Sequence, residues 1–93
     1  MATPSSFPAA CAWFAEWAVA NSGQNDQLLV CYALYKQATE GPCRAREPSV
    51  LKPKERAKWN AWAGLGDMNS DVARQLYVDE VNRLRADAGL APL

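Results

Sequence analysis

The 93-residue chain contains no histidine, which excludes a histidine general base, a Ser–His triad and histidine-ligated metals. Its three cysteines, Cys11, Cys31 and Cys43, are widely spaced and form no CxxC pair. We therefore expect no disulfide framework and a reducing, cytoplasmic location. No nucleophile has an evident base beside it. We expect a protein that is not an enzyme and that carries no metal or cofactor.

Basic residues are missing from the first part of the chain. Residues 1–35 contain no lysine or arginine, and Glu16 interrupts their apolar start. This segment fits neither a signal peptide nor a membrane span, so we expect a soluble protein. Ten bases and ten acids cancel over the chain, but residues 36–58 hold seven bases and three acids. A basic patch on a neutral chain favours a small phosphorylated ligand over nucleic acid, although a merely solvated charged face is the alternative.

Strand signals are absent as well, because nothing alternates with period two and β-branched residues are few. Apolar residues instead recur with helical spacing in four segments, which cover residues 8–20, 26–39, 53–64 and 69–88. Residues 41–51 contain two prolines and a glycine and are expected to form a long ordered loop, which in compact domains is often functional. The sequence predicts one domain over residues 1–93, an all-α bundle of four helices.

The stretch "YALYKQATEG" places two phenols and an ammonium on one helical face, because Tyr32, Tyr35 and Lys36 are spaced three and four residues apart. A buried stripe would not need the lysine, and a solvated stripe would not need the tyrosines. The pattern predicts a surface for a ligand with a flat ring and negative charge. Interhelical packing of the tyrosines beside an ordinary surface lysine is the structural alternative.

Three motifs occur in order: "YALYKQATEG", "RAKWNAW" and "ARQLYVDEVNRL". Together they resemble the acyl-CoA-binding protein family, whose pattern can be followed without a gap from Leu28 to about Leu84. The resemblance implies an up-down-down-up four-helix bundle with a long loop between the second and third helices. It also implies a long-chain acyl-CoA ester as the ligand.

The resemblance further implies roles for individual residues. Tyr32 and Tyr35 would contact the nucleotide, and Tyr77 would reach in from the last helix. Lys36 and Lys58 would pair with phosphates, chiefly the 3′-phosphate of the ribose. The acyl chain would lie in an apolar groove between the first two helices, beside Leu28, Leu29, Ala10 and Cys11. Trp59 and Trp62 are expected in the core rather than in the ligand wall.

These expectations describe a monomeric intracellular carrier that binds medium- to long-chain fatty acyl-CoA esters and holds a pool of them without catalysis. Such a carrier would make transient contacts with membranes or acyl-CoA-using enzymes. Burial of each tail methylene contributes about 0.8 kcal/mol, so free coenzyme A should bind far more weakly than its long-chain ester. The alternative is a helical protein–protein interaction module, in which exposed aromatics would meet a partner helix.

Overall fold

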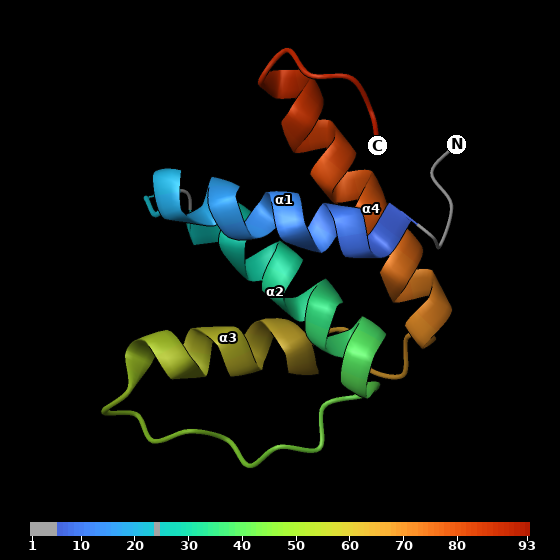
Figure 1. The fold of residues 1–93 in the computed structure, drawn as a ribbon. Coiled ribbons are helices and arrows are strands. Elements are labelled where there is room, and N and C mark those ends of the chain that lie inside the picture. The colour runs from blue at the N-terminus through green and yellow to red at the C-terminus, as the bar shows by residue number, and fades with distance from the viewer. Residues whose placement is uncertain (1–5, 24) are drawn as a thin grey trace.

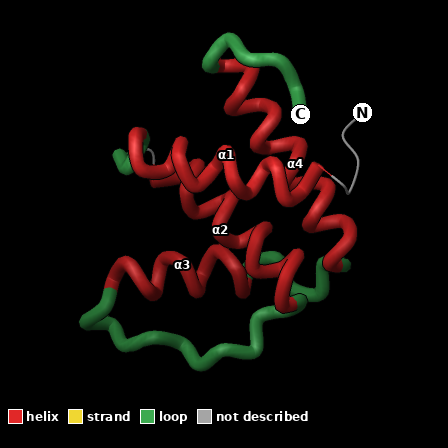
Figure 2. Tube along the Cα trace, viewed as in Figure 1, coloured by secondary structure: helices red, strands yellow, loops and turns green. Residues whose placement is uncertain are grey.

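The computed structural model describes residues 6–23 and 25–93. These residues form four helices and no strand (Figure 2). The helices are α1 (Phe7–Ala20), α2 (Asn25–Glu40), α3 (Pro53–Ala63) and α4 (Ser70–Asp87). The predicted all-α class is confirmed, and each predicted helix boundary lies within one residue of the observed one.

The four helices form an up-down-down-up bundle in which α2 packs against both α3 and α4, while α1 packs mainly against α4. Figure 1 shows α2 and α3 running in the same direction and α1 running in the opposite direction on the side of α2 away from α3. Parallel neighbours need a connection about as long as the helix itself, which for the 11 residues of α3 is ~16 Å. The loop of residues 41–52 spans that distance beside α3, which confirms the predicted long loop (Figure 1).

The end of α2 and the long loop are held by two indole groups of α3. Gly41 follows the last residue of α2 with a φ of 81°, a left-handed conformation that ends helices and favours glycine. The indole nitrogen of Trp62 donates to the carbonyl of Gly41 at 2.9 Å, and that of Trp59 donates to the carbonyl of Ala45 at 2.8 Å. Burial of Trp62 and half-burial of Trp59 therefore fix the start of the loop on α3.

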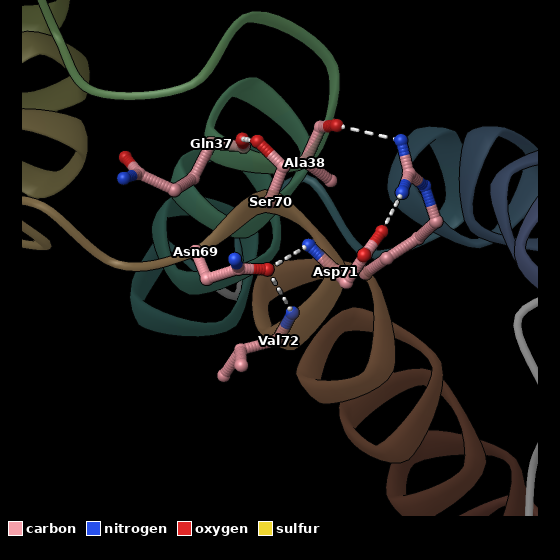
Figure 3. A network of polar contacts seen from close by, with 7 residues as sticks. Gln37, Ala38, Asn69, Ser70, Asp71 and Val72 are labelled. Atoms are coloured by element: carbon pink, nitrogen blue, oxygen red, sulfur yellow. Dashed lines mark hydrogen bonds and ion pairs between the residues drawn. The ribbon is translucent and has the colours of Figure 1, made fainter.

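One buried amide joins α2 to the turn between α3 and α4. The side chain of Gln37 is fully buried, and its Nε2 donates to the carbonyls of Gly66 at 3.0 Å and Met68 at 2.8 Å. The hydroxyl of Ser70 donates in return to the backbone carbonyl of Gln37 at 3.0 Å (Figure 3). Buried polar groups are costly unless they are paired, so these contacts fix α2 against the start of α4.

The first turn of α4 is capped and also completes the end of α2. The side-chain oxygen of Asn69 accepts from the backbone nitrogens of Asp71 at 2.7 Å and Val72 at 3.4 Å, so Asn69 is the N-cap of α4 (Figure 3). Arg74 donates to the Asp71 carboxylate at 2.8 Å and to the carbonyl of Ala38 at 2.9 Å. A cation at this end of α2 also stabilises the helix dipole.

The core lies where α1, α2 and α4 meet, and small side chains allow the helices to approach closely. Ala10 of α1 and Ala73 of α4 are both completely buried in it. Aromatic rings of α1 close the core from one side. The remaining buried members of the cluster are Cys31, Leu34, Ala38, Tyr77, Val78, Val81 and Leu84.

Replacing Gln37 with Leu should destabilise the fold by about 1–3 kcal/mol, because two partly buried backbone carbonyls lose their side-chain donor. Urea denaturation measures this loss. The matched control is Gln75→Leu, which removes one surface hydrogen bond to Asp79 and should change the free energy of unfolding by no more than about 0.5 kcal/mol. Equal effects of the two substitutions would contradict the assigned role of Gln37.

Candidate functional site

The predicted face of α2 is present, and a lysine from α3 joins it. Tyr32 is half-buried, while Tyr35 is 42% exposed. The ammonium of Lys58 lies 5.4 Å from the centroid of the Tyr32 ring, and that of Lys36 lies 4.9 Å from the Trp62 ring. Each ammonium is attracted to the electron-rich ring face, which holds it near the protein surface. The structure thus brings two predicted cations to one aromatic surface.

Lys36 has a second partner that the sequence analysis did not identify. Its ammonium forms an ion pair with the carboxylate of Glu40, one helical turn further along α2. The hydrogen bond to Glu40 raises the pKa of Lys36, so the ammonium stays charged. The spacing of four residues between the two could have predicted this pair. An anionic ligand that binds Lys36 must therefore compete with Glu40.

A polar cavity of about 490 Å³ lies between α2, the long loop and α3. Lys36 and Arg44 supply positive charge to it, and Glu40 supplies the opposing carboxylate. Among the described residues Arg44 has no carboxylate within ion-pair distance. The other lining residues are Tyr32, Pro42, Ala45 and Trp62. This cavity is suited to an anion that carries several oxygen acceptors.

An aromatic cavity of about 310 Å³ lies between α1 and α2, with Tyr77 of α4 in its wall. Tyr77 is buried, its ring lies edge-on to Phe7 at 5.2 Å, and it lies 6.2 Å from Tyr35. Burial raises the pKa of Tyr77, so the phenol is neutral. The other lining residues are Cys11, Phe14, Ala15, Cys31, Tyr32 and Tyr35. Flat faces of this kind suit a ring system.

An apolar cavity of about 400 Å³ lies between α2 and α3. Leu28 and Leu29 form its α2 side, and Pro53 and Ala57 form its α3 side. Lys54 and Lys58 also line it. Long lysine side chains can cover apolar surface with their methylenes while their ammonium groups stay in water. The result is an apolar trough with positive charge on the α3 side.

The four apolar residues expected to share one groove between the first two helices do not line one cavity. Leu28 and Leu29 line the cavity with α3, whereas Cys11 lines the aromatic cavity with Tyr77. Ala10 is completely buried in the core and lines neither. The reason is that α1 packs mainly on α4, so its buried face meets α4 rather than the leucines of α2.

Tyr32 lines two of the three cavities and contacts a residue of the third. Its side chain lines both the polar and the aromatic cavity, and the Lys58 ammonium above its ring belongs to the apolar cavity. Neither Ala57 nor Pro53 was expected in the site. The parallel course of α2 and α3 could have indicated them, because it places the start of α3 beside the start of α2. The five polar residues predicted for the site therefore all lie in or beside these cavities.

Other kinds of site receive no support from the described part of the chain. None of its helices combines the length and apolar character that a membrane span requires. No cluster of three or more His, Cys, Asp or Glu side chains that could ligate a metal occurs within residues 6–23 and 25–93.

Comparison with known proteins identifies the class. The model of the family described as "Acyl CoA binding protein" matches residues 5–81. The chain belongs to the acyl-CoA-binding protein family. Its domain is a non-catalytic binding domain, although in some relatives it is one part of an enzyme. The resemblance seen in the three sequence motifs is thereby confirmed.

The most informative relatives differ in length and architecture. Acyl-CoA-binding domain-containing protein 4 of Oryza sativa subsp. japonica is 49% identical over 79 residues, which cover 84% of this chain and 24% of that protein. Human enoyl-CoA delta isomerase 2 is 52% identical over 60 residues, covering 64% of this chain and 15% of the isomerase. The chain thus spans about a quarter or less of these curated relatives.

Two solved structures share the fold over nearly their whole length. The crystal structure of Oryza sativa acyl-CoA-binding protein 2 superimposes with a TM-score of 0.75 at 32% identity, covering 89% of this chain and 94% of that one. The solution structure of the acyl-CoA-binding protein from Babesia bovis gives a TM-score of 0.70, also at 32% identity, covering 92% and 97%.

Alkaline pH should destabilise the fold partly through Cys31, because burial raises the pKa of this thiol from 9.0 to about 12. The unfolded chain loses the thiol proton first, so this contribution to stability is complete below about pH 9 and is lost as pH rises towards about 12. Urea denaturation across this range should show a shallower decline for Cys31→Ala than for the wild type. Cys43→Ala, in the loop, is the control and should keep the wild-type slope; an unchanged slope in Cys31→Ala would contradict the prediction.

Proposed function

We propose that this chain binds medium- to long-chain fatty acyl-CoA esters non-covalently, with the ligand extended over α2. The observation that carries the proposal is the position of Tyr32, which lines the aromatic and the polar cavity and lies under the ammonium of Lys58 from the apolar cavity. An acyl-CoA has the same three parts, namely an adenine ring, phosphates and a hydrocarbon tail. Family membership supports this ligand class independently.

The polar half of the ligand would lie over the two tyrosines. In our proposal the nucleotide ring stacks near Tyr32 and Tyr35 in the aromatic cavity, with Tyr77 behind it. The phosphates, the 3′-phosphate above all, bind Lys36 and Lys58. Charge-assisted hydrogen bonds of this kind contribute about 1.5–3 kcal/mol each. Arg44 lines the polar cavity together with Lys36 and would bind the remaining phosphate groups.

The tail would lie in the apolar cavity between α2 and α3, beside Leu28 and Leu29. This position follows from the lining of the cavity and replaces the groove expected between the first two helices. Because each buried methylene contributes about 0.8 kcal/mol, ten of them contribute about 8 kcal/mol before the cost of association. The tail therefore supplies most of the affinity. Free coenzyme A would bind much more weakly.

We further propose that the chain acts without catalysis, as a monomeric carrier that holds a pool of acyl-CoA in the cytoplasm. Cys11, Cys31 and Cys43 are all free thiols, which suits a reducing compartment. Burial raises the pKa of both Cys11 and Cys31, the two thiols that line the aromatic cavity, which opposes their use as thiolate nucleophiles. The carrier would exchange its ligand with membranes or with enzymes that use acyl-CoA.

A helical protein-interaction module remains the second candidate, because Tyr35 exposes two fifths of its surface. Titration with hexadecanoyl-CoA separates the two. Saturable one-to-one binding supports the carrier. Lack of binding would leave the aromatic face as a docking surface for a partner helix.

Replacing Lys36 or Lys58 with Ala should weaken acyl-CoA binding by about 2–3 kcal/mol, or roughly 30- to 150-fold, through loss of a phosphate contact. The free energy of unfolding should fall by no more than about 1 kcal/mol, since Lys58→Ala loses a cation–π contact, Lys36→Ala loses a cation–π contact and a surface ion pair with Glu40, and neither leaves a cavity. Isothermal calorimetry and urea denaturation measure the two effects.

Lys52→Ala is the matched control for these variants, because its only carboxylate partner among the described residues is Glu55, at 3.9 Å, and both side chains are exposed. It should bind as the wild type does. Glu40→Gln should tighten binding, since the carboxylate that competes for Lys36 is gone. The losses from Lys36→Ala and Lys58→Ala should shrink with a 3′-dephospho ester. Wild-type affinity in both lysine variants would disprove the phosphate site.

Affinity should rise from octanoyl- to dodecanoyl- to hexadecanoyl-CoA until the cavity between α2 and α3 is filled. Ala57→Phe narrows this cavity and should weaken binding more as the acyl chain lengthens. Calorimetry on the three esters checks both expectations. Recovery of intact thioester after each titration also tests the absence of catalysis.

The matched control for the tail is Ala15→Phe, which places the same ring in the aromatic cavity. Its loss of affinity should be the same for all three esters, because it affects only their common coenzyme part. If the two variants gave equal chain-length dependence, the tail would not lie between α2 and α3.

A further inference from the structure

The turn that joins the long loop to α3 exposes two adjacent large apolar side chains. Val50 is 74% exposed and Leu51 is 86% exposed. In Figure 1 this turn lies at the far end of the loop, beside the first residues of α3. Only Val19, on α1, is comparably exposed among the large apolar residues of the described chain. Two such neighbours at a loop tip expose apolar surface to water at a cost in free energy. Exposed apolar surface of this kind is typical of an interaction site.

The turn is ordered, so it holds these side chains outward. The hydroxyl of Ser49 accepts a hydrogen bond from the backbone nitrogen of Leu51 at 3.2 Å. The backbone carbonyl of Ser49 accepts one from the backbone nitrogen of Lys52 at 3.0 Å. Arg56 reaches back from α3 and donates to the carbonyl of Pro48 at 2.8 Å. Because the backbone is already fixed, burying Val50 and Leu51 elsewhere in this protein would require breaking these contacts. Presentation of the apolar pair is therefore built into the turn.

Positive charge surrounds the apolar pair. Lys52 and Lys54 follow it directly, and both are exposed. The only carboxylate within ion-pair distance of either, among residues 6–23 and 25–93, is that of Glu55, 3.9 Å from Lys52 and itself largely exposed. Aliphatic side chains flanked by lysines are suited to the surface of a bilayer that contains anionic lipid. The aliphatic side chains would enter the boundary between headgroups and acyl chains, and the ammonium groups would bind lipid phosphates.

The same segment forms one wall of the apolar cavity. Pro53 and Lys54 line the cavity between α2 and α3, and only Lys52 separates them from the exposed pair in sequence. A bilayer that contacts Val50 and Leu51 would therefore lie beside the cavity in which we place the acyl tail. The apolar pair is aliphatic and lacks the Trp, Tyr and Arg anchors that dominate protein–protein interfaces, which favours a bilayer over a protein partner.

We propose that residues 50–54 dock this protein on anionic lipid bilayers, next to the entrance of the tail cavity. The part of the proposal that concerns acyl-CoA exchange rests on the proposed function, whereas docking itself needs no acyl-CoA. Binding combines partition of Val50 and Leu51 with attraction of Lys52 and Lys54 to anionic headgroups. It should therefore weaken as the salt concentration rises.

The test is co-sedimentation of the ligand-free protein with vesicles of phosphatidylcholine alone or mixed with phosphatidylserine. The wild type should bind the mixed vesicles and not the neutral ones. Val50→Ser combined with Leu51→Ser should lower the partition coefficient at least about tenfold. Lys52→Gln combined with Lys54→Gln should lower it roughly thirtyfold. Val19→Ser, an equally exposed apolar residue on α1, is the control and should bind as the wild type does.

Absence of binding to the mixed vesicles, equal binding to neutral vesicles, or wild-type binding by either double variant would overturn the proposal. An equal loss in Val19→Ser would do so too, because it would show non-specific adsorption. The Val50→Ser, Leu51→Ser variant should keep the wild-type affinity for hexadecanoyl-CoA in solution. Calorimetry of that variant therefore distinguishes failure of docking from failure of acyl-CoA binding.

Discussion

The buried amide of Gln37 sets the rotation of α2, and the rest of the site depends on that rotation. Its two hydrogen bonds to the α3–α4 turn fix the rotation of the last turns of α2 about the helix axis. Tyr32 and Lys36, on the neighbouring face, are thereby directed towards α3 and the loop. A small rotation of α2 would break buried hydrogen bonds, so the orientation of the ligand face is coupled to the stability of the fold.

The second constraint is the parallel course of α2 and α3, which only a long connection allows. It brings the start of α3 beside the start of α2, so that Leu29 and Ala57 line one trough and Lys58 stands over Tyr32. The loop that makes this course possible is held by Trp59 and by Arg56, which also pairs with Glu47. The loop is therefore a structural part of the site and supplies Arg44 to the polar cavity.

The sequence predicted the helices and the class because helical spacing and breaker residues are local signals. The Tyr32, Tyr35 and Lys36 face was predictable for the same reason, since one helix carries it. Leu28 and Leu29 were expected to share a groove with Ala10 and Cys11 but face α3 instead, because the packing of α1 on α4 depends on contacts that no local pattern records. Gln37 was also missed: a glutamine in a helix reveals a structural role only when its distant carbonyl partners are known.

The pairing of Lys36 with Glu40 has a consequence for a reversible carrier. Because a carboxylate and an aromatic ring already hold this lysine, little side-chain entropy would be lost when it binds a phosphate. The phosphate would, however, have to displace the carboxylate. The pair thus lowers the electrostatic affinity for phosphate, but it also holds the ammonium group in position before the ligand binds. In the proposed binding mode the tail supplies the larger share of the free energy, so the chain could lose some polar affinity and still bind tightly. A moderated polar site beside a strong apolar one suits a ligand that must be retained in water and released elsewhere.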